Sequence, residues 1–454
     1  MPAKHWREST LKLTLPNGEL NHLSYCSNIH PGETWQQVSD NLHRFLPGMR
    51  SALQLEDELG IGLRLSALAV SELAQAEAME EFKAFLAANR LYVFTINGFP
   101  YGPFHGTRVK EDVYLPDWQD AERLRYTNEL ADVFAQFLPD GQTGSISTVP
   151  GAFKARVSDE DCVWSMANNM VEHVVHLAKL EQHTGKRIVL ALEPEPCCFL
   201  ETIDESVAFF SNYLYSPASR EQLSNALGVD ADTADQLLHT HLTLCLDLCH
   251  AAVEFEHYDN CIAALRSASV TIGKLQISAG LRLESVTSDT IALLQPFDDQ
   301  VYLHQVVERR AGALTRYTDL SEAFAGLEDD DALNEADKDA SNTSDTANFN
   351  EVNSADSASS SGARDTIQNV AQNTENTREW RVHFHVPIFL DDLGEFSSTQ
   401  FFVREALEKH RTDPVTEHLE VETYTWSVLP EQFREQGMDA AIVRELQWVR
   451  DQLS

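Results

Sequence analysis

Three acidic residues stand at or near the ends of three short β-rich runs, two of which are aliphatic. Glu193 ends residues 187–193 just before Pro194, Asp247 ends residues 242–247, and Glu422 lies near the end of residues 418–424. Strand alternation puts Glu420 on the same face as Glu422, and we choose Glu422 because it lies nearer the carboxyl end. Burying a carboxylate costs several kcal/mol unless a cation or hydrogen-bond donors meet it. The three acids therefore predict a shared cation site.

His250 follows Asp247 by three residues. A carboxylate and an imidazole at this spacing can both bind one cation, or one can bind the metal while the other binds the substrate. We expect a divalent ion (Mn, Mg, Co or Zn), and the oxygen-rich ligands suit Mn, Mg or Co better than a thiolate zinc site does. Buried cysteines usually pack as small apolar residues, so we expect no sulfur ligand from the four nearby thiols, Cys197, Cys198, Cys245 and Cys249. A lone strand-end acid can instead cap a helix or pair with an arginine.

Eight β-rich runs alternate with helical segments, which is typical of parallel strands joined by crossover helices. The runs are residues 22–26, 61–66, 91–97, 144–149, 187–193, 242–247, 272–278 and 418–424. The clearest helices are expected over residues 68–89, 118–137 and 161–182. Eight strands predict an α/β fold, a single (β/α)8 TIM barrel over residues 1–454 whose strand ends converge on one mouth.

One further strand-like segment, residues 381–389, precedes a predicted helix over residues 398–409. It either displaces one of the eight strands or forms a hairpin with residues 301–307. Both segments lie in the long excursion between the seventh and eighth strands. The pattern leaves these two alternatives open.

Composition excludes several classes of protein. The 71 acidic and 34 basic residues give a net charge of −37, which disfavours binding to nucleic acid. Seven cysteines without a C-x-x-C pair argue against a disulfide framework, and no long apolar run predicts a membrane span or a signal core. We therefore expect a cytoplasmic protein that acts on a small-molecule metabolite.

An acidic low-complexity insertion occupies residues 328–378, and over residues 328–364 it contains ten acidic and two basic residues with almost no large apolar side chain. Such a segment cannot bury a core and is expected to be disordered. Deleting residues 328–364 should therefore leave the melting temperature almost unchanged, because loop closure costs grow slowly with length. A loss of more than about 2 kcal/mol in unfolding free energy would mean that the segment packs.

Several motifs resemble the xylose isomerase-like barrels, a superfamily of sugar phosphate isomerases and epimerases that includes endonuclease-IV-type enzymes. The segment A-L-E-P-E-P-C-C-F-L-E-T resembles a metal-binding strand of ketose 3-epimerases, with Glu193 and Glu201 in the matching places. The segment L-D-L-C-H resembles their D-x-x-H, and V-E-T-Y resembles their last-strand glutamate. The resemblance implies that Glu193, Asp247 and Glu422 bind metal and that His250 contacts substrate.

The chain departs from that pattern on the seventh strand, where the epimerases carry a metal-binding histidine and this chain has Gln276. Three readings remain open. Gln276 supplies a neutral oxygen ligand, or His383 or His385 replaces the imidazole, or catalysis has been lost. If His383 and His385 belong to the hairpin instead, we expect them to be remote from the mouth.

Further segments, among them S-N-I-H-P-G-E-T-W, N-G-F-P-Y-G-P-F-H-G and R-V-H-F-H-V-P-I-F, resemble one branch of this superfamily that is implicated in secondary-metabolite processing or traffic. Other proteins of the same pathway are then expected partners. His30, Asn97 and His105 follow the first and third strands and are expected, with His250 and His385, as substrate contacts. Lys110, Asp112 and Asp117 are expected to be solvated charges.

The expected activity is metal-dependent isomerisation or epimerisation of a small hydroxy-carbonyl compound, with Glu193 and Glu422 as base and acid. A non-catalytic barrel that binds and delivers a metabolite is the first alternative. Metal-dependent hydrolysis is the second, and the strongly negative charge disfavours its DNA-cleaving form.

Overall fold

A computed structural model describes residues 10–103, 110–298, 303–327, 377–424 and 437–454. Its largest sheet contains eight parallel strands in the order β2, β14, β8, β7, β6, β5, β4, β3, and a bridge between Cys26 and Gly62 joins the last strand to the first. The short β1 (Lys12–Thr14) pairs antiparallel with β2. This closed ring confirms the predicted TIM barrel.

The barrel strands match the eight predicted runs to within a few residues. They are β2 (Leu20–Tyr25), β3 (Leu59–Arg64), β4 (Leu91–Asn97), β5 (Gly144–Thr148), β6 (Ile188–Leu192), β7 (Leu242–Asp247), β8 (Ile272–Ile277) and β14 (His418–Val421). Nearly every strand residue is buried, because helices cover the outside of the ring and side chains fill its inside. Continuous aliphatic sequence is the expected signature of such strands.

Helices surround the barrel: α1 (Trp35–Ala52), α2 (Ala67–Leu73), α3 (Ala76–Asn89), α4 (Ala121–Ala135), α5 (Glu160–Thr184), α6 (Ile203–Phe209), α7 (Pro217–Leu227), α8 (Ala231–His241), α9 (Leu248–Val253), α10 (Tyr258–Ser267), α14 (Gln400–Thr412) and α16 (Met438–Leu453). The prediction of one helix over residues 68–89 is wrong. Ser66 caps a short α2 that ends at Leu73, and α3 begins again after Gln75.

The excursion between β8 and β14 forms a second, antiparallel sheet in the order β11, β10, β12, β9, β13. These strands are β9 (Ala279–Leu283), β10 (Val306–Arg310), β11 (Ala313–Tyr317), β12 (Arg378–Val386) and β13 (Ser397–Ser398). β12 contains most of the ambiguous segment 381–389 and pairs with β10 and β9, so it displaces no barrel strand. The hairpin alternative therefore describes this segment.

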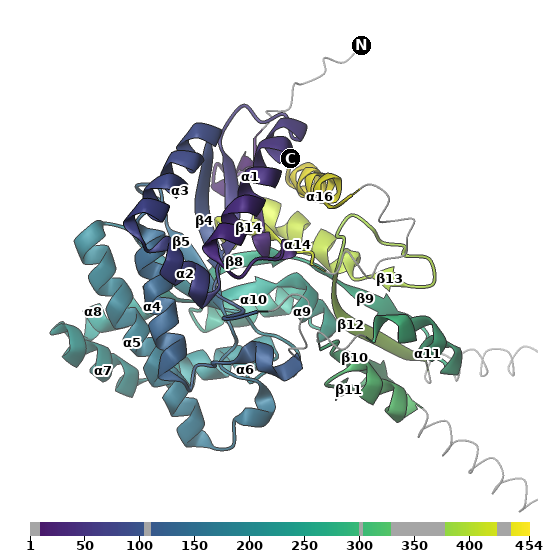
Figure 1. Ribbon diagram of the computed structural model, residues 1–454. Helices are drawn as coiled ribbons and strands as arrows, with labels where there is room; N and C mark the ends of the chain where they lie inside the picture. Colours follow the sequence, from purple (N-terminus) through teal and green to yellow (C-terminus); the bar gives the residue numbers. More distant parts are fainter. Residues whose placement is uncertain (1–9, 104–109, 299–302, 328–376, 425–436) are drawn as a thin grey trace, which may run out of the picture.

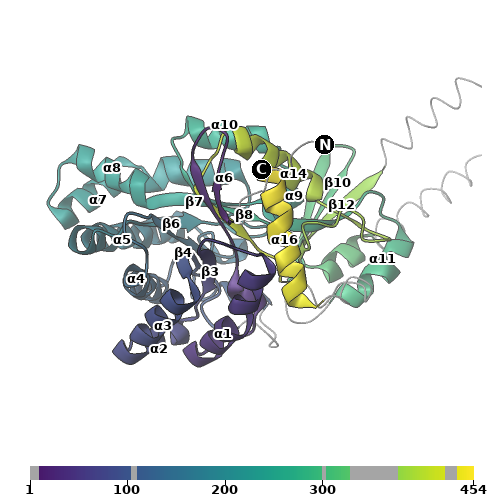
Figure 2. The same cartoon turned by 90° about the horizontal axis from the view of Figure 1, so that it is seen from above.

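Figures 1 and 2 show the second sheet and α11 (Ser288–Leu294) on one side of the barrel, opposite α7 and α8. The helix α9, which follows β7, contacts both β9 and β12, and α14 contacts β9. The second sheet is thereby held against the carboxyl end of the barrel. Most of the acidic insertion, residues 328–376, lies outside the described residues. Among the described residues no helix is long and apolar enough to cross a membrane.

Candidate metal centre

The structure brings Glu193, Asp247, Gln276 and Glu422 together at the carboxyl ends of β6, β7, β8 and β14. The Gln276 Nε2 atom lies 2.6 Å from Glu193 Oε1, 2.8 Å from Asp247 Oδ2 and 2.5 Å from Glu422 Oε2. Strand order explains this convergence, because β8 lies between β7 and β14 and pairs Gln276 with Asp247 on one side and Glu420 on the other. Three carboxylates therefore face one point.

This cluster is buried and short of hydrogen-bond donors. Glu193, Asp247 and Glu422 are 6%, 2% and 4% exposed. The Gln276 amide has two N–H groups for three carboxylates, and Glu193 Oε2 has no hydrogen-bond partner among the described residues. Burial, with the nearby charges of Glu422 and Asp247, raises the pKa of Glu193 well above its usual value. A cation among these oxygens would reduce the repulsion between the carboxylates and would give Glu193 Oε2 a partner.

Asp247 differs from Glu193 because it has good donors. Burial alone would raise its pKa, but His250 and His385 nearby bring the pKa of Asp247 below its usual value. Its Oδ1 accepts hydrogen bonds from Ser278 Oγ at 2.7 Å and from the His250 backbone N–H at 2.9 Å, which caps α9. Asp247 is therefore held as a carboxylate.

Three imidazoles lie beside the carboxylates. His250 comes from α9, and His383 and His385 come from β12 in the second sheet. The His385 Nε2 atom is 4.0 Å from Asp247 Oδ2, and its Nδ1 atom is 3.2 Å from Glu422 Oε2. The expectation that a hairpin strand would be remote from the mouth is wrong, because β12 pairs with β10 and still reaches the site.

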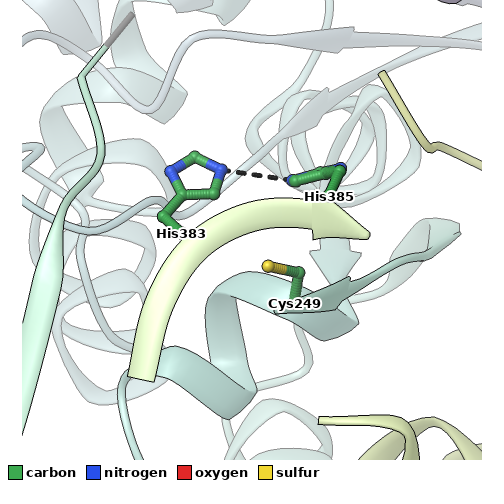
Figure 3. A group of neighbouring side chains, drawn as sticks. All are labelled: Cys249, His383 and His385. Atoms are coloured by element: carbon green, nitrogen blue, oxygen red, sulfur yellow. Dashed lines mark hydrogen bonds between the residues drawn. The ribbon is translucent and has the colours of Figure 1, made fainter. Parts of the chain in front are cut away.

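Figure 3 shows the imidazoles of His383 and His385 on one side of the β12 ribbon and the Cys249 thiol on the other. Cys249 Sγ contacts the Phe384 carbonyl at 3.6 Å, and burial raises the pKa of this thiol to about 11. Burial likewise raises the pKa of Cys245 well above its usual value. Both sulfurs are therefore protonated thiols, as is usual for buried cysteine.

A pocket opens to solvent above this cluster, and the space between its walls, open solvent included, is about 590 Å³. Asp247 and Gln276 lie beneath it, and its wall combines polar groups with apolar groups from the loops that follow β4. It is lined by Asn28, Asn97, Phe99, Pro100, Lys110, Val113, Tyr114, Glu193, Glu195, His250, Leu303, Gln305, His383, His385, Glu422 and Tyr424. A pocket in which a few polar groups converge among apolar ones is the usual kind of binding site for a small ligand.

The expected substrate contacts fall in different places. Asn97 lines the cavity and donates from Nδ2 to Glu422 Oε1 at 3.1 Å. His30 is not among the cavity residues; it stacks on Phe45 with ring centroids 4.2 Å apart. His105 lies outside the described residues. Glu201 accepts a hydrogen bond from the Cys197 backbone N–H at 2.7 Å and pairs with Lys154, so its role here is structural.

Several polar residues of the cavity, among them Asn28, Glu195, Gln305 and Lys110, were not predicted as site residues from the sequence. Asn28 donates to Glu422 Oε1 at 2.5 Å, and Glu195 accepts from the Tyr114 hydroxyl at 2.6 Å while Gln305 lies beside both. Lys110 was expected to be solvated, but it is only 8% exposed and pairs with Asp319. Two features of the sequence could have indicated these residues. Asn28 lies just after the first strand, and Glu195 is the second glutamate of the E-P-E-P segment.

Asp117 was also expected to be a solvated charge, and this expectation is wrong. Its side chain is completely buried, and it pairs with Arg156 at 3.0 Å between Oδ2 and Nε. The backbone N–H of Gln119 donates to the other carboxylate oxygen at 2.9 Å. Asp117 therefore anchors the loop before α4.

Comparison with solved structures finds distant xylose isomerase-like barrels. A xylose isomerase domain containing protein from Salmonella typhimurium LT2 is 12% identical, over 95% of this chain and 96% of that one, with a TM-score of 0.34. A xylose isomerase-like TIM barrel protein from Mycobacterium smegmatis, in complex with magnesium, is 16% identical over 60% and 72%, with a TM-score of 0.33. The probable 3-DHS dehydratase AsbF from Bacillus anthracis is 15% identical over 61% and 78%, with a TM-score of 0.32.

No protein-family model and no curated protein matches this chain. At such low TM-scores the likeness to solved structures adds nothing to the assignment of the fold. The fold assignment therefore rests on the strand order and the closure of the ring described above.

Proposed function

We propose that this barrel is a metal-dependent isomerase or epimerase of a small hydroxy-carbonyl metabolite. One observation carries the proposal. Three buried carboxylates from the ends of three different strands, Glu193, Asp247 and Glu422, converge within hydrogen-bonding distance of a single amide nitrogen beneath a pocket with polar and apolar walls. Three like charges held this close without a cation are costly, so an ion-binding role accounts for their arrangement.

Glu193, Asp247 and Glu422 would hold the ion, and Gln276 would supply its amide oxygen after a half-turn of the side-chain amide. When bound, a divalent ion polarises the substrate oxygens and makes the neighbouring C–H more acidic. Mn, Mg or Co suits this oxygen-rich donor set, and Zn remains compatible with it.

Two carboxyl groups of this site face the cavity and can move a proton. Burial raises the pKa of Glu193 above its usual value, and a cation bound to this carboxyl group would oppose that rise. Glu422 Oε1 accepts hydrogen bonds from both Asn28 and Asn97, which hold this carboxyl group at the edge of the cavity. Glu193 would take a proton from carbon as the base, and Glu422 would return one as the acid.

The walls of the cavity suit a small substrate with both polar and apolar parts. Phe99, Val113 and Leu303 offer apolar contact, while Lys110 and Asn97 offer donors to oxygens. His250 and His385 lie next to the reacting carboxyls and would contact substrate oxygens there. The motif resemblance supports a finer proposal, that the protein resembles the metabolite traffic protein EboE and processes a secondary metabolite alongside other proteins of that pathway.

Elemental analysis of protein purified without an affinity tag tests the metal. We expect a bound divalent ion near one per chain at the carboxylates, and exchange of a substrate C–H for deuterium in D₂O with candidate ketoses or polyols. Protein that contains no ion, takes up none from solution and catalyses no exchange would contradict the proposal.

One observation favours a second function, a barrel that binds and delivers a metabolite without turnover. The Gln276 Nε2 atom lies within hydrogen-bonding distance of all three carboxylates, so the amide occupies the place where a cation would sit. In that case the site is neutralised by the glutamine and by protonation of Glu193, and the cavity binds its ligand without a metal.

The substitution Gln276→His distinguishes the two functions. Imidazole is a stronger metal ligand than an amide, so we expect at least a tenfold gain in affinity for Co²⁺ or Zn²⁺, measured by isothermal titration. If the wild-type protein takes up no ion at the carboxylates and only the variant does, the second function is favoured. If His385 already served as the missing ligand of this site, Gln276→His would bring no gain.

A further inference from the structure

The Nε2 atoms of His250, His383 and His385 form a closed triangle at the wall of the cavity. The distances are 3.0 Å between His250 and His383, 3.2 Å between His383 and His385, and 3.4 Å between His385 and His250. All three side chains are at most 6% exposed and all three line the cavity. These distances are as short as those between hydrogen-bonded atoms, although all three atoms are imidazole nitrogens of the same kind.

The opposite nitrogen of each ring faces an oxygen. The His250 Nδ1 atom lies 2.8 Å from the Pro194 carbonyl oxygen. The His383 Nδ1 atom lies 2.8 Å from Gln305 Oε1, and the His385 Nδ1 atom lies 3.1 Å from the Glu422 carbonyl oxygen. Gln305 presents its oxygen here because its Nε2 donates to the Tyr114 hydroxyl at 3.0 Å. Since two of these oxygens are backbone carbonyls, which only accept, Nδ1 carries the proton and Nε2 carries a lone pair in each neutral ring.

Three lone pairs at these separations repel unless something positive lies among them. A single proton on one of these nitrogens can point at only one of its two neighbours. It leaves the other contacts of the triangle without a proton. A single cation in contact with all three nitrogens satisfies the whole triangle.

We propose that His250, His383 and His385 form a second, all-nitrogen metal site, separate from the carboxylate site. Ligand nitrogens about 2.0–2.1 Å from a tetrahedral zinc ion lie about 3.3 Å apart, close to the observed triangle. The Nδ1 hydrogen bonds to carbonyl and amide oxygens are the usual support of metal-binding histidines. Neutral imidazoles select Zn²⁺, Co²⁺, Ni²⁺ or Cu²⁺ over Mg²⁺ and Ca²⁺.

The proposed site has an open side toward the cavity, as in catalytic zinc centres with three protein ligands. The Tyr424 hydroxyl lies 3.4 Å from His383 Nε2 at this edge. An oxygen of the substrate or a water would take the fourth position. Asp247 Oδ2, 4.0 Å from His385 Nε2, links this site to the carboxylates, so the two ions would act on one substrate. The assignment holds whether or not an ion binds at the carboxylates.

The test is a titration of the metal-free full chain with Co²⁺ and Zn²⁺, read by equilibrium binding, by Co²⁺ visible absorption and by X-ray absorption at the zinc edge. We expect an ion with imidazole neighbours in the wild-type protein. His383→Ala and His250→Ala should each weaken the binding of that ion at least tenfold. Asp247→Asn and Glu193→Gln should still bind the ion at the imidazoles and should lose the ion at the carboxylates.

His239→Ala is the matched control, since this histidine lies on α8 and stacks on Tyr215 outside the cavity. Cys249→Ala should also leave the ion in place. Melting temperatures without metal show whether each variant folds, and a zinc-induced rise in melting temperature that disappears in His383→Ala supports the site in a second way. Unchanged Co²⁺ and Zn²⁺ binding in both cavity-histidine variants, or a zinc spectrum with only oxygen neighbours or with sulfur, would overturn the proposal even if the carboxylate ion were confirmed.

Discussion

Asp247→Asn is expected to weaken binding of a divalent ion at the carboxylates by about 10 to 100-fold or more, while the protein stays folded. The asparagine oxygen can still accept from Ser278 and from the His250 backbone N–H, so the cap of α9 is kept. The lost charge relieves the crowding that raises the pKa of Glu193, but it also removes a carboxylate whose pKa lies below its usual value, so the unfolding free energy without metal should change little. Isothermal titration with Mn²⁺ and thermal unfolding of the metal-free protein measure the two effects.

Glu193→Gln should behave in the same way as Asp247→Asn. Glu201→Gln is the matched control, because Glu201 is equally buried at 6% exposure and follows the same strand but lies away from the cluster. If Asp247→Asn and Glu193→Gln both keep the wild-type metal content, these acids are structural and the proposed carboxylate site is wrong.

Lys274→Met is expected to lower the free energy of unfolding by about 3–5 kcal/mol, the usual loss when one partner of a buried ion pair is removed. Lys274 and Glu420 are both fully buried inside the barrel and form an ion pair, and Lys274 Nζ also donates to Ser147 Oγ at 3.1 Å. Burial opposes the charge of Lys274, but Glu420 and the other acidic groups around it raise its pKa above its ordinary value. Chemical denaturation at neutral pH measures the loss.

The double variant Lys274→Met with Glu420→Leu should recover most of that stability, since it leaves no unpaired charge in the barrel. Lys12→Met is the control, because its pair with Glu58 is exposed and should contribute at most about 1 kcal/mol. A double variant as unstable as Lys274→Met would show that the loss comes from packing and not from the unpaired carboxylate.

The barrel was predictable because its strands are short β-rich runs, some of them almost wholly aliphatic, that alternate with helical segments and are buried on both faces. The same local pattern could not tell where β12 belongs. Its sequence is equally suited to a barrel strand, and only its pairing with β10 and β9 across the excursion decides the matter. The break between α2 and α3 was missed because the residues there are ordinary helix formers without proline or glycine.

The strand-end acids were predictable for a geometrical reason. In a parallel barrel the carboxyl ends of all strands meet, so Glu193, Asp247 and Glu422 had to approach one another. Residues on the connecting segments follow no such rule. His30 and Asn28 are two residues apart, yet Asn28 reaches Glu422 while His30 turns to stack on Phe45. The direction of such side chains depends on loop conformation, which the sequence pattern does not encode.

Because β12 brings His383 and His385 to the mouth from the second sheet, the barrel alone cannot assemble all the groups that surround the cavity. The stability of the sheet that contains β9, β10 and β12 should therefore depend on whether a ligand occupies the cavity. Any ligand that touches these imidazoles stabilises that sheet by an amount set by its concentration and dissociation constant. Protection of the β10 and β12 amides from hydrogen exchange should then report binding at a distance from the ligand itself.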